Sequence, residues 1–238
     1  MIEHTIGNQR LILADCRDAI ELLSGDCFLT DTPYGVEGGR GGQAREHGKA
    51  AYVTDGWEDT PEMISSVAVP VITKLAAICQ RGALTPGIRC MNLYPRPADI
   101  GCFWTPAAAG RGPCGFTTFN PILYYGKDYR AGKGQTPTGK QVTERAQKNG
   151  HPCPKPLEAW KWLLEKVSQE GETVIDPFMG SGTTLVACQQ LGRNGIGVEI
   201  CEEYFEIACQ QVEWAVRGLK PPIAGQSEQR QNVGLFDD

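Results

Sequence analysis

The sequence predicts an α/β protein built on a doubly wound, mostly parallel sheet. Strand-like and helix-like runs alternate between residues 157 and 217, a pattern typical of parallel strands joined by helical crossovers. A strand–helix–strand series also opens the chain, over residues 10–31. The 238 residues, 41% hydrophobic and 21% charged, suit one sizeable core better than two. We therefore expect a single domain over residues 1–218.

Three elements are expected at the start of the chain. Apolar runs at 10–14 and 27–30 predict two strands, the second ending at Asp31, and residues 19–23 between them suit a helix. The segment 35–48 holds six glycines and almost no large apolar side chain. Because such a segment cannot bury itself, it predicts a mobile loop.

The middle of the chain predicts one helix and one strand. Thr60 is followed by a proline and by apolar residues at helical spacing as far as Ala77, which is typical of a capped helix. Residues 83–125 are rich in proline, glycine and aromatic side chains, and within them 116–125 is the best strand candidate.

The last third of the chain alternates clearly between helices and strands. In order, it predicts a helix that opens after Pro156 and stops at Gly171, a strand at 173–176, a helix at 183–191, a strand at 196–199 and a helix at 202–217. The polar tail 219–238 is expected to be disordered.

Composition excludes several classes of protein. The ten cysteines form no C-x-x-C pair, so we expect buried free thiols and neither a zinc site nor a disulfide framework. The first residues lack the basic and apolar regions of a signal peptide, and no apolar run reaches the roughly 20 residues that span a bilayer. We expect a cytoplasmic protein without a membrane partner.

A glycine-containing segment carries the sharpest chemical signal. Asp176-Pro-Phe-Met-Gly-Ser-Gly-Thr-Thr184 lies between a predicted strand and a predicted helix. Its glycines let the backbone approach a ligand, and the helix offers free N–H groups to a carboxylate or phosphate. Glu199, at the end of the next strand, can accept hydrogen bonds from both hydroxyls of a ribose. The segment predicts a nucleoside cofactor site, although a glycine pair alone would indicate only a tight turn. NAD and ATP fit less well, because neither G-x-G-x-x-G nor G-K-[ST] is present.

A second segment, Asp31-Thr-Pro-Tyr-Gly35, follows a predicted strand. The exocyclic amine of a nucleobase is a poor nucleophile, because its lone pair is delocalised into the ring. The Asp31 carboxylate and the Thr32 carbonyl could both accept from this amine and favour the pyramidal nitrogen that attacks a methyl group. The Tyr34 ring could stack on the base. An ordinary turn would explain the tetrapeptide if it stood alone.

These segments resemble motifs of the S-adenosylmethionine-dependent amino-methylating DNA methyltransferases. DTPYG is similar to their catalytic D-P-P-Y motif, and DPFMGSGTT is similar to their cofactor motif. His151-Pro-Cys-Pro-Lys155-Pro matches the H-P-x-x-K-P pattern that precedes a helix in the circularly permuted beta class, where the catalytic motif also comes first. Thr32 stands where the family has its first proline. Since that position contributes its carbonyl, we expect the same reaction.

The resemblance implies a class I methyltransferase fold and a role for each motif residue. The catalytic residues would be Asp31, Thr32, Pro33 and Tyr34. The cofactor S-adenosylmethionine would be held by Asp15, Lys155, Asp176, Phe178, Gly180, Ser181, Gly182, Thr183 and Glu199. Among these, Gly180 to Thr183 would hold the methionine part with Lys155 nearby, Glu199 would bind the ribose and Asp15 would contact the adenine.

Beside such a site, basic segments are the preferred contacts to double-stranded DNA. The net charge is −5, yet residues 127–150, a short target-recognition insertion, hold six basic residues against two acidic ones. The expected DNA contacts are Arg40, Arg45, Lys127, Arg130, Lys133, Lys140, Arg145 and Lys148. By itself the charge run would indicate only a solvated loop.

For several aromatic residues and for His151, a structural role is weighed against a functional one. Trp160 and Trp162 are expected to pack a helix. Trp57 either contacts DNA or anchors its loop, and Phe116 either stacks on the target base or belongs to the core. His151 is expected to be a polar turn residue and not a base.

The sequence thus predicts methyl transfer to adenine N6 in DNA, without a metal or a covalent enzyme intermediate. The base must leave the stack, because the Asp31 carboxylate could not reach it inside a duplex. The resemblance favours adenine, since an Asp begins the catalytic motif, and N4-cytosine methylation is the nearest alternative. RNA or free nucleosides are further substrates to consider. A glutamine-directed protein methyltransferase is disfavoured, because its motif begins with Asn and follows the cofactor motif. A non-catalytic DNA-binding or cofactor-sensing protein is the alternative of another class. The oligomeric state, a homodimer included, stays open.

Overall fold

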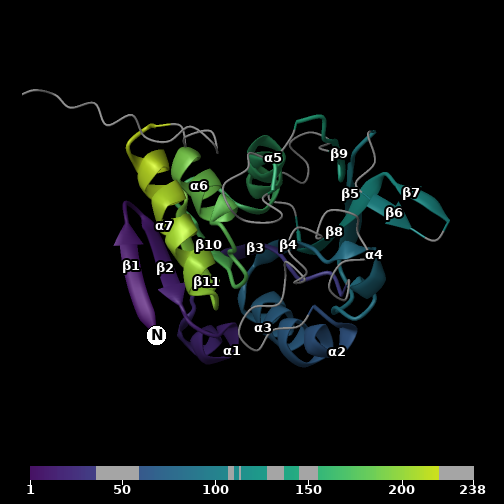
Figure 1. The fold of residues 1–238 in the computed structure, drawn as a ribbon, viewed down its shortest axis with the longest axis horizontal. Helices are drawn as coiled ribbons and strands as arrows, with labels where there is room; N and C mark the ends of the chain where they lie inside the picture. The colour runs from purple at the N-terminus through teal and green to yellow at the C-terminus, as the bar shows by residue number, and fades with distance from the viewer. Residues whose placement is uncertain (36–58, 107–109, 113, 128–136, 145–154, 220–238) are drawn as a thin grey trace, which may run out of the picture.

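The computed structural model describes residues 1–35, 59–106, 110–112, 114–127, 137–144 and 155–219. A nine-stranded sheet runs through the molecule in the order β1-β2-β11-β10-β3-β4-β8-β5-β9 (Figure 1). Its strands are β1 (Ile2–Ile6), β2 (Gln9–Leu13), β3 (Cys27–Asp31), β4 (Arg81–Thr85), β5 (Asp99–Trp104), β8 (Phe119–Gly126), β9 (Lys140–Gln141), β10 (Thr173–Asp176) and β11 (Asn194–Glu199). A separate hairpin consists of β6 (Gly110–Gly112) and β7 (Gly115–Thr117).

Helices cover both faces of the sheet, with α1, α2 and α3 on one side and α5, α6 and α7 on the other (Figure 1). Apolar side chains pack between the helices and the strands on both sides. The helical segments are α1 (Cys16–Ala19), η1 (Ile20–Leu22), α2 (Pro61–Met63), η2 (Ile64–Ala68), α3 (Val69–Ile78), α4 (Gly87–Cys90), α5 (Leu157–Val167), α6 (Thr183–Gln190) and α7 (Glu202–Val216).

Most of the sheet is parallel, as the sequence predicts. The pairs from β2 through β11, β10 and β3 to β4 are all parallel. The sheet departs from this pattern toward its two edges. On one side β1 pairs with β2 in antiparallel register, and on the other β8 pairs with β4 and β5 in antiparallel register. Because the parallel strands share one direction, their carboxyl ends lie along one edge of the sheet.

The expected elements of the last third are confirmed within a few residues. The first of its helices ends earlier than expected, at Val167, because the chain becomes extended at Ser168, and Gly171 lies in the turn before β10. The N-terminal predictions are confirmed as β2, α1 with η1, and β3. Strands β1, β4 and β5 were not predicted from the sequence. The tail from 220 and most of the expected insertion, 128–136 and 145–150, lie outside the described residues.

The helix predicted after Thr60 runs over Pro61–Ile78, and the Thr60 side chain caps it by accepting a hydrogen bond from the N–H of Met63. With a hydropathy of 1.4 over 18 residues, this helix is long and apolar enough to cross a membrane by length and composition, contrary to our expectation that no run approaches that limit. In the fold, its side chains Ile64, Val71 and Leu75 are buried in the core against the sheet.

The direction of the crossovers reverses between the neighbouring strands β10 and β3. After β10 the chain passes through α6 to β11 on one side, whereas after β3 it passes through α3 to β4 on the other. Such a reversal opens a crevice at the carboxyl ends of the two strands, where ligands of doubly wound sheets bind. Asp31 ends β3 and Asp176 ends β10, so both acidic residues flank this crevice.

Candidate active site

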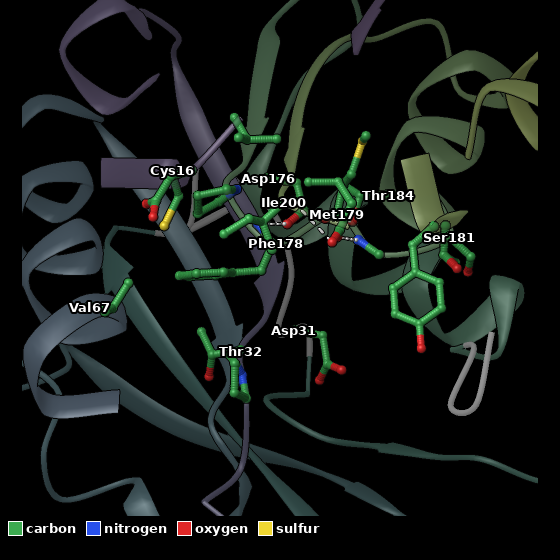
Figure 2. A pocket seen from close by; sticks show the side chains of 18 of the residues that line it. Cys16, Asp31, Thr32, Val67, Asp176, Phe178, Met179, Ser181, Thr184 and Ile200 are labelled. Atoms are coloured by element: carbon green, nitrogen blue, oxygen red, sulfur yellow. Dashed lines mark hydrogen bonds between the residues drawn. The ribbon is translucent and has the colours of Figure 1, made fainter. Parts of the chain in front are cut away.

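A cavity lies at this carboxyl edge, and the motifs from distant parts of the sequence meet in it. Its lining includes twelve of the thirteen predicted catalytic and cofactor residues, all except Gly182. In the view of Figure 2, the ring of Phe178 lies between Cys16 and the pair Asp31 and Thr32. The cavity is therefore lined both by the segment after β10 and by the segment after β3.

The glycine segment adopts the backbone that its sequence predicts. Gly180 and Gly182 have φ values of 51° and 82°, which residues with a side chain rarely adopt. A Cβ atom at Gly182 would also lie 3.0 Å from the Cβ of Ala208. Gly182 is the N-cap of α6, so the glycine pair turns the chain tightly from β10 into the helix beside the cavity.

The Asp176 carboxyl group stabilises this turn by accepting hydrogen bonds. Its Oδ1 accepts hydrogen bonds from the Thr30 hydroxyl at 2.6 Å and from the Phe178 N–H at 3.1 Å, and its Oδ2 accepts from the Thr184 hydroxyl. The Trp160 ring donates to the same Thr184 hydroxyl at 2.8 Å. Burial raises the pKa of Asp176 to about 6, although these donors oppose the shift. The carboxyl group thus links β10, β3 and α6.

Glu199 closes the neighbouring side of the cavity. Its Oε2 accepts from the N–H of Gly180 at 2.9 Å, and its Oε1 accepts from the N–H groups of Ile200 and Cys201 at 3.0 and 2.9 Å. Burial raises the pKa of Glu199 to about 7 against the effect of these three donors. The side chain ties the glycine turn to β11 and also faces the cavity.

Asp31 is surrounded by donors that come from different parts of the sequence. Its Oδ1 accepts from the Tyr34 hydroxyl at 2.8 Å and from the Thr85 hydroxyl at the end of β4. Its Oδ2 forms an ion pair of 2.6 Å with Lys155. The Asn120 amide in turn donates to the Tyr34 hydroxyl at 2.7 Å. The carboxylate is therefore fixed on one oxygen by neutral donors and on the other by an ammonium group.

The Tyr34 ring lies close to the backbone at Gly87 and to the Lys155 ammonium group. A Cβ atom at Gly87 would lie only 2.7 Å from the Tyr34 Cγ, so only glycine permits this approach. The Lys155 ammonium lies 5.1 Å from the centre of the Tyr34 ring. Burial, and secondarily the Asp31 carboxylate, raise the pKa of Tyr34, which keeps the phenol neutral. Thr32 is 2% exposed, and its hydroxyl lies 3.4 Å from the Thr85 carbonyl.

Two predicted cofactor residues have partners that the sequence did not indicate. Asp15 caps α1 by accepting from the Arg17 N–H at 2.8 Å, and it also pairs with the Arg17 guanidinium. Hydrogen bonds from Arg17 lower the pKa of Asp15. Lys155, expected near the methionine part of a cofactor, forms an ion pair with the Asp31 carboxylate. Both side chains still line the cavity.

Sequence reasoning missed Thr85 and Thr30, which donate hydrogen bonds to the Asp31 and Asp176 carboxylates, and Asn120, which donates to the Tyr34 hydroxyl. Thr85 and Asn120 lie on strands β4 and β8, and no motif marks either residue. Their contacts follow from the position of these strands in the sheet rather than from any local pattern. Arg17 carried a weak signal, since it lies two residues after Asp15.

Of the predicted DNA contacts, only Lys127 and Lys140 are described. Lys127 is exposed directly after β8, and Lys140 lies on the edge strand β9 with its ammonium 3.3 Å from the Glu158 carbonyl. The other predicted contacts, Arg40, Arg45, Arg130, Lys133, Arg145 and Lys148, fall outside the described residues.

The remaining aromatic and cysteine predictions have mixed outcomes. Phe116 is 75% exposed on β7, so its interpretation as a core residue is wrong. Trp160 is 2% exposed and packs α5, as expected, and Trp162 contacts Phe103. Trp57 and His151 lie outside the described residues. Among the described cysteines, all free, the buried ones are Cys16, Cys27, Cys79, Cys90 and Cys188. The described residues include no cluster of three or more metal-binding side chains.

Comparison with known proteins agrees with this geometry. Residues 124–210 match the family described as DNA methylase. The chain is 40% identical over 69 residues to the type II methyltransferase M.HpaI of Haemophilus parainfluenzae. The resemblance to the amino DNA methyltransferases is confirmed. That alignment covers 29% of this chain and 22% of M.HpaI, so the chain matches about a fifth of the relative's length.

Solved structures of DNA methyltransferases share their fold with most of this chain. The structure of the M1.HpyAVI–SAM complex superposes with a TM-score of 0.62 at 19% identity, covering 86% of this chain and 98% of that one. The cytosine-N4-specific PvuII DNA methyltransferase superposes with a TM-score of 0.60 at 13% identity, covering 90% and 94%. The predicted class I methyltransferase fold is confirmed.

Proposed function

We propose that this protein is a site-specific DNA methyltransferase that transfers a methyl group from S-adenosylmethionine to the N6 amine of adenine. One observation carries the proposal: the Asp31 carboxylate and the Tyr34 ring line the same cavity as the glycine turn and Glu199. An acceptor for an amine, a ring for stacking and a nucleoside-binding turn are what amino methylation of a base requires.

The residues of the cavity fit S-adenosylmethionine. Gly180 lines the cavity and has no side chain, so its backbone can approach a ligand closely. The Glu199 carboxylate retains acceptor capacity on Oε2, which receives one N–H, so it can accept from ribose hydroxyls. The cofactor supplies a methyl group whose carbon is electrophilic because it is bonded to a sulfonium.

In this mechanism the protein acts by positioning and by charge. The Asp31 carboxylate and the Thr32 carbonyl accept the two N–H groups of the target amine, which directs its lone pair at the methyl carbon. S-adenosylmethionine would supply the methyl group, and its sulfur would keep the electron pair of the broken C–S bond. The Asp31 carboxylate would stabilise the positive charge that develops on the amine, which would then release one proton to solvent. Tyr34 stacks against the base, which must be flipped out of the duplex.

The choice of adenine rests on the resemblance, since an Asp begins the catalytic motif. The geometry serves cytosine N4 equally well, and one similar structure is a cytosine-N4-specific enzyme. The purified protein should be incubated with genomic DNA from a methylation-free host and with labelled S-adenosylmethionine, and the nucleosides analysed by mass spectrometry. N6-methyladenine is expected. N4-methylcytosine alone would overturn the choice of base and leave the other roles intact.

The same experiment separates an enzyme from a binding protein. A non-catalytic DNA-binding or cofactor-sensing protein would transfer no label to DNA, RNA or free nucleosides. The ordered network around Asp31 argues against that alternative, since it fixes a carboxylate that a binding protein would not need.

We further propose that DNA binds across the basic residues predicted from the sequence, of which Lys127 and Lys140 are described. We also propose that the protein belongs to a restriction–modification system.

A further inference from the structure

We propose that Lys155 is a positioning residue that exchanges partners: it pairs with Asp31 until an oxyanion of a bound ligand takes over its ammonium group. The exchange frees the Asp31 oxygen that receives the target amine. This inference rests on the proposed function, because it concerns how the carboxylate becomes available for a base.

The first argument is that one oxygen of Asp31 is already fully used. Oδ1 accepts from the hydroxyls of Tyr34 and Thr85. The Tyr34 hydroxyl has one proton, and it lies between the Asp31 carboxylate, which can only accept, and the Asn120 amide at 2.7 Å. The proton must therefore point to Asp31, and Asn120 must donate. Because two donors occupy Oδ1, an incoming amine has to bind at Oδ2.

The second argument is that Lys155 stands where the base has to go. Its ammonium lies 2.6 Å from Oδ2 and 5.1 Å from the centre of the Tyr34 ring. These are the two contacts assigned to the target base, the amine on the carboxylate and the stacked ring on the tyrosine. The pair is only partly exposed, with 16% of the Lys155 side chain and 26% of the Asp31 side chain accessible. A base cannot reach both groups unless the ammonium moves.

The third argument is the charge of the reaction. Positive charge develops on the amine as it takes the methyl group, and the Asp31 carboxylate stabilises that charge only if it is not already neutralised. An ammonium in contact with Oδ2 cancels the carboxylate and repels the developing cation. The resting ion pair thus opposes the very step that Asp31 serves, so the ammonium needs another anion before the reaction.

A ligand can supply that anion in two ways. The amino acid end of S-adenosylmethionine carries a carboxylate, and Lys155 lines the same cavity as the glycine turn. A flipped nucleotide carries its flanking phosphates. Both are oxyanions that compete with a carboxylate for an ammonium group. In either case, breaking the Lys155–Asp31 pair costs part of the binding free energy of the ligand. The exchange can therefore be measured from binding affinities alone.

The test is a double-mutant cycle read out by calorimetry. The wild type, D31N, K155M and the double variant are titrated with S-adenosylhomocysteine, which has the amino acid end, and with 5′-methylthioadenosine, which lacks it. A mixed-sequence DNA duplex is the third ligand. T85V is the matched control, because it removes a donor from Asp31 Oδ1 and leaves the pair on Oδ2. Thermal unfolding checks that each variant is folded.

If the carboxylate is the oxyanion, D31N binds S-adenosylhomocysteine about five- to tenfold more tightly than the wild type, while T85V does not. The gain disappears in the K155M background, and 5′-methylthioadenosine binds all proteins alike. If a phosphate is the oxyanion, the same pattern is found with the duplex instead. Unchanged affinity of D31N for both ligands, or a gain that persists without Lys155, overturns the exchange. A wild type that binds neither nucleoside overturns the proposed function itself.

Discussion

Affinity for the nucleoside part of the cofactor should depend on pH through Glu199. Ribose hydroxyls donate hydrogen bonds, so they bind the ionised carboxylate and not the protonated acid. Burial raises the pKa of Glu199 to about 7. At pH 6 roughly nine-tenths of the carboxyl groups are protonated and at pH 8 about one-tenth, because one pH unit changes the ratio tenfold. Binding should therefore tighten about tenfold from pH 6 to pH 8.

The direction of this pH dependence follows from proton linkage. The ligand prefers the form with fewer bound protons, so affinity rises with pH through the pKa of the free protein, and binding near pH 7 releases about half a proton. The ligand to use is 5′-methylthioadenosine, since it carries the ribose and no titratable amino acid. Calorimetry in two buffers with different ionisation enthalpies measures the released proton directly.

The control for this prediction is Glu199→Gln, which cannot ionise. At pH 8 its affinity for the nucleoside should be about 5- to 150-fold lower than that of the wild type, because charge-assisted hydrogen bonds worth roughly 1–3 kcal/mol are lost. Its remaining pH dependence gives the contribution of Asp176, whose pKa burial raises to about 6. If the wild type and this variant show the same pH dependence, Glu199 does not bind the ribose.

Four further predictions test other parts of the site. Asp31→Asn should abolish methylation, measured as label transferred to DNA, while the nucleoside still binds; substantial turnover would contradict the role of Asp31. Asn120→Ala should lower kcat about tenfold through misplacement of Tyr34, with cofactor affinity unchanged; a loss confined to KM would argue against positioning. Lys127→Gln and Lys140→Gln should each flatten the dependence of log DNA affinity on log salt by about one unit per lost phosphate contact, and an unaltered slope would remove the residue from the DNA interface. Gly182→Ala should lower the free energy of unfolding by about 1–2 kcal/mol, because its φ of 82° is costly for any side chain; an unchanged denaturant midpoint would refute that cost.

The last third of the fold could be predicted almost element by element, because its strands are short and buried, α5 and α7 have an apolar face, and Gly182 and Gly192 mark the ends of α6. In α5, for instance, Trp160, Leu163 and Val167 recur at helical spacing and are all buried. The same reasoning failed for β1, whose residues are nearly all exposed. An edge strand without a buried face has no period in its hydrophobicity, so the pairing of β1 with β2 decides its structure.

The candidate site was predictable where its chemistry lies within a motif and not where it lies between motifs. Gly180 was expected from its place after a strand, it lines the cavity, and its left-handed backbone follows from the tight turn. Lys155 was assigned to the cofactor by resemblance, and its ammonium also forms an ion pair with Asp31, 124 positions away. Asn120 had no signal at all, because an asparagine in a strand acquires meaning only from the hydroxyl that it faces.

The order of the motifs along the chain does not determine the site, because the motifs follow strands that are neighbours in the sheet. β3 precedes β10 by well over one hundred residues, but the two strands pair in parallel and end at the same edge. The Thr30 hydroxyl of β3 donates to the buried Asp176 carboxylate of β10 at 2.6 Å, which joins the catalytic and cofactor segments directly beneath the cavity. A chain that visited these strands in the opposite order would form the same hydrogen bond and the same crevice. Permutation of the motifs is therefore compatible with unchanged chemistry, whereas loss of the β3–β10 pairing is not.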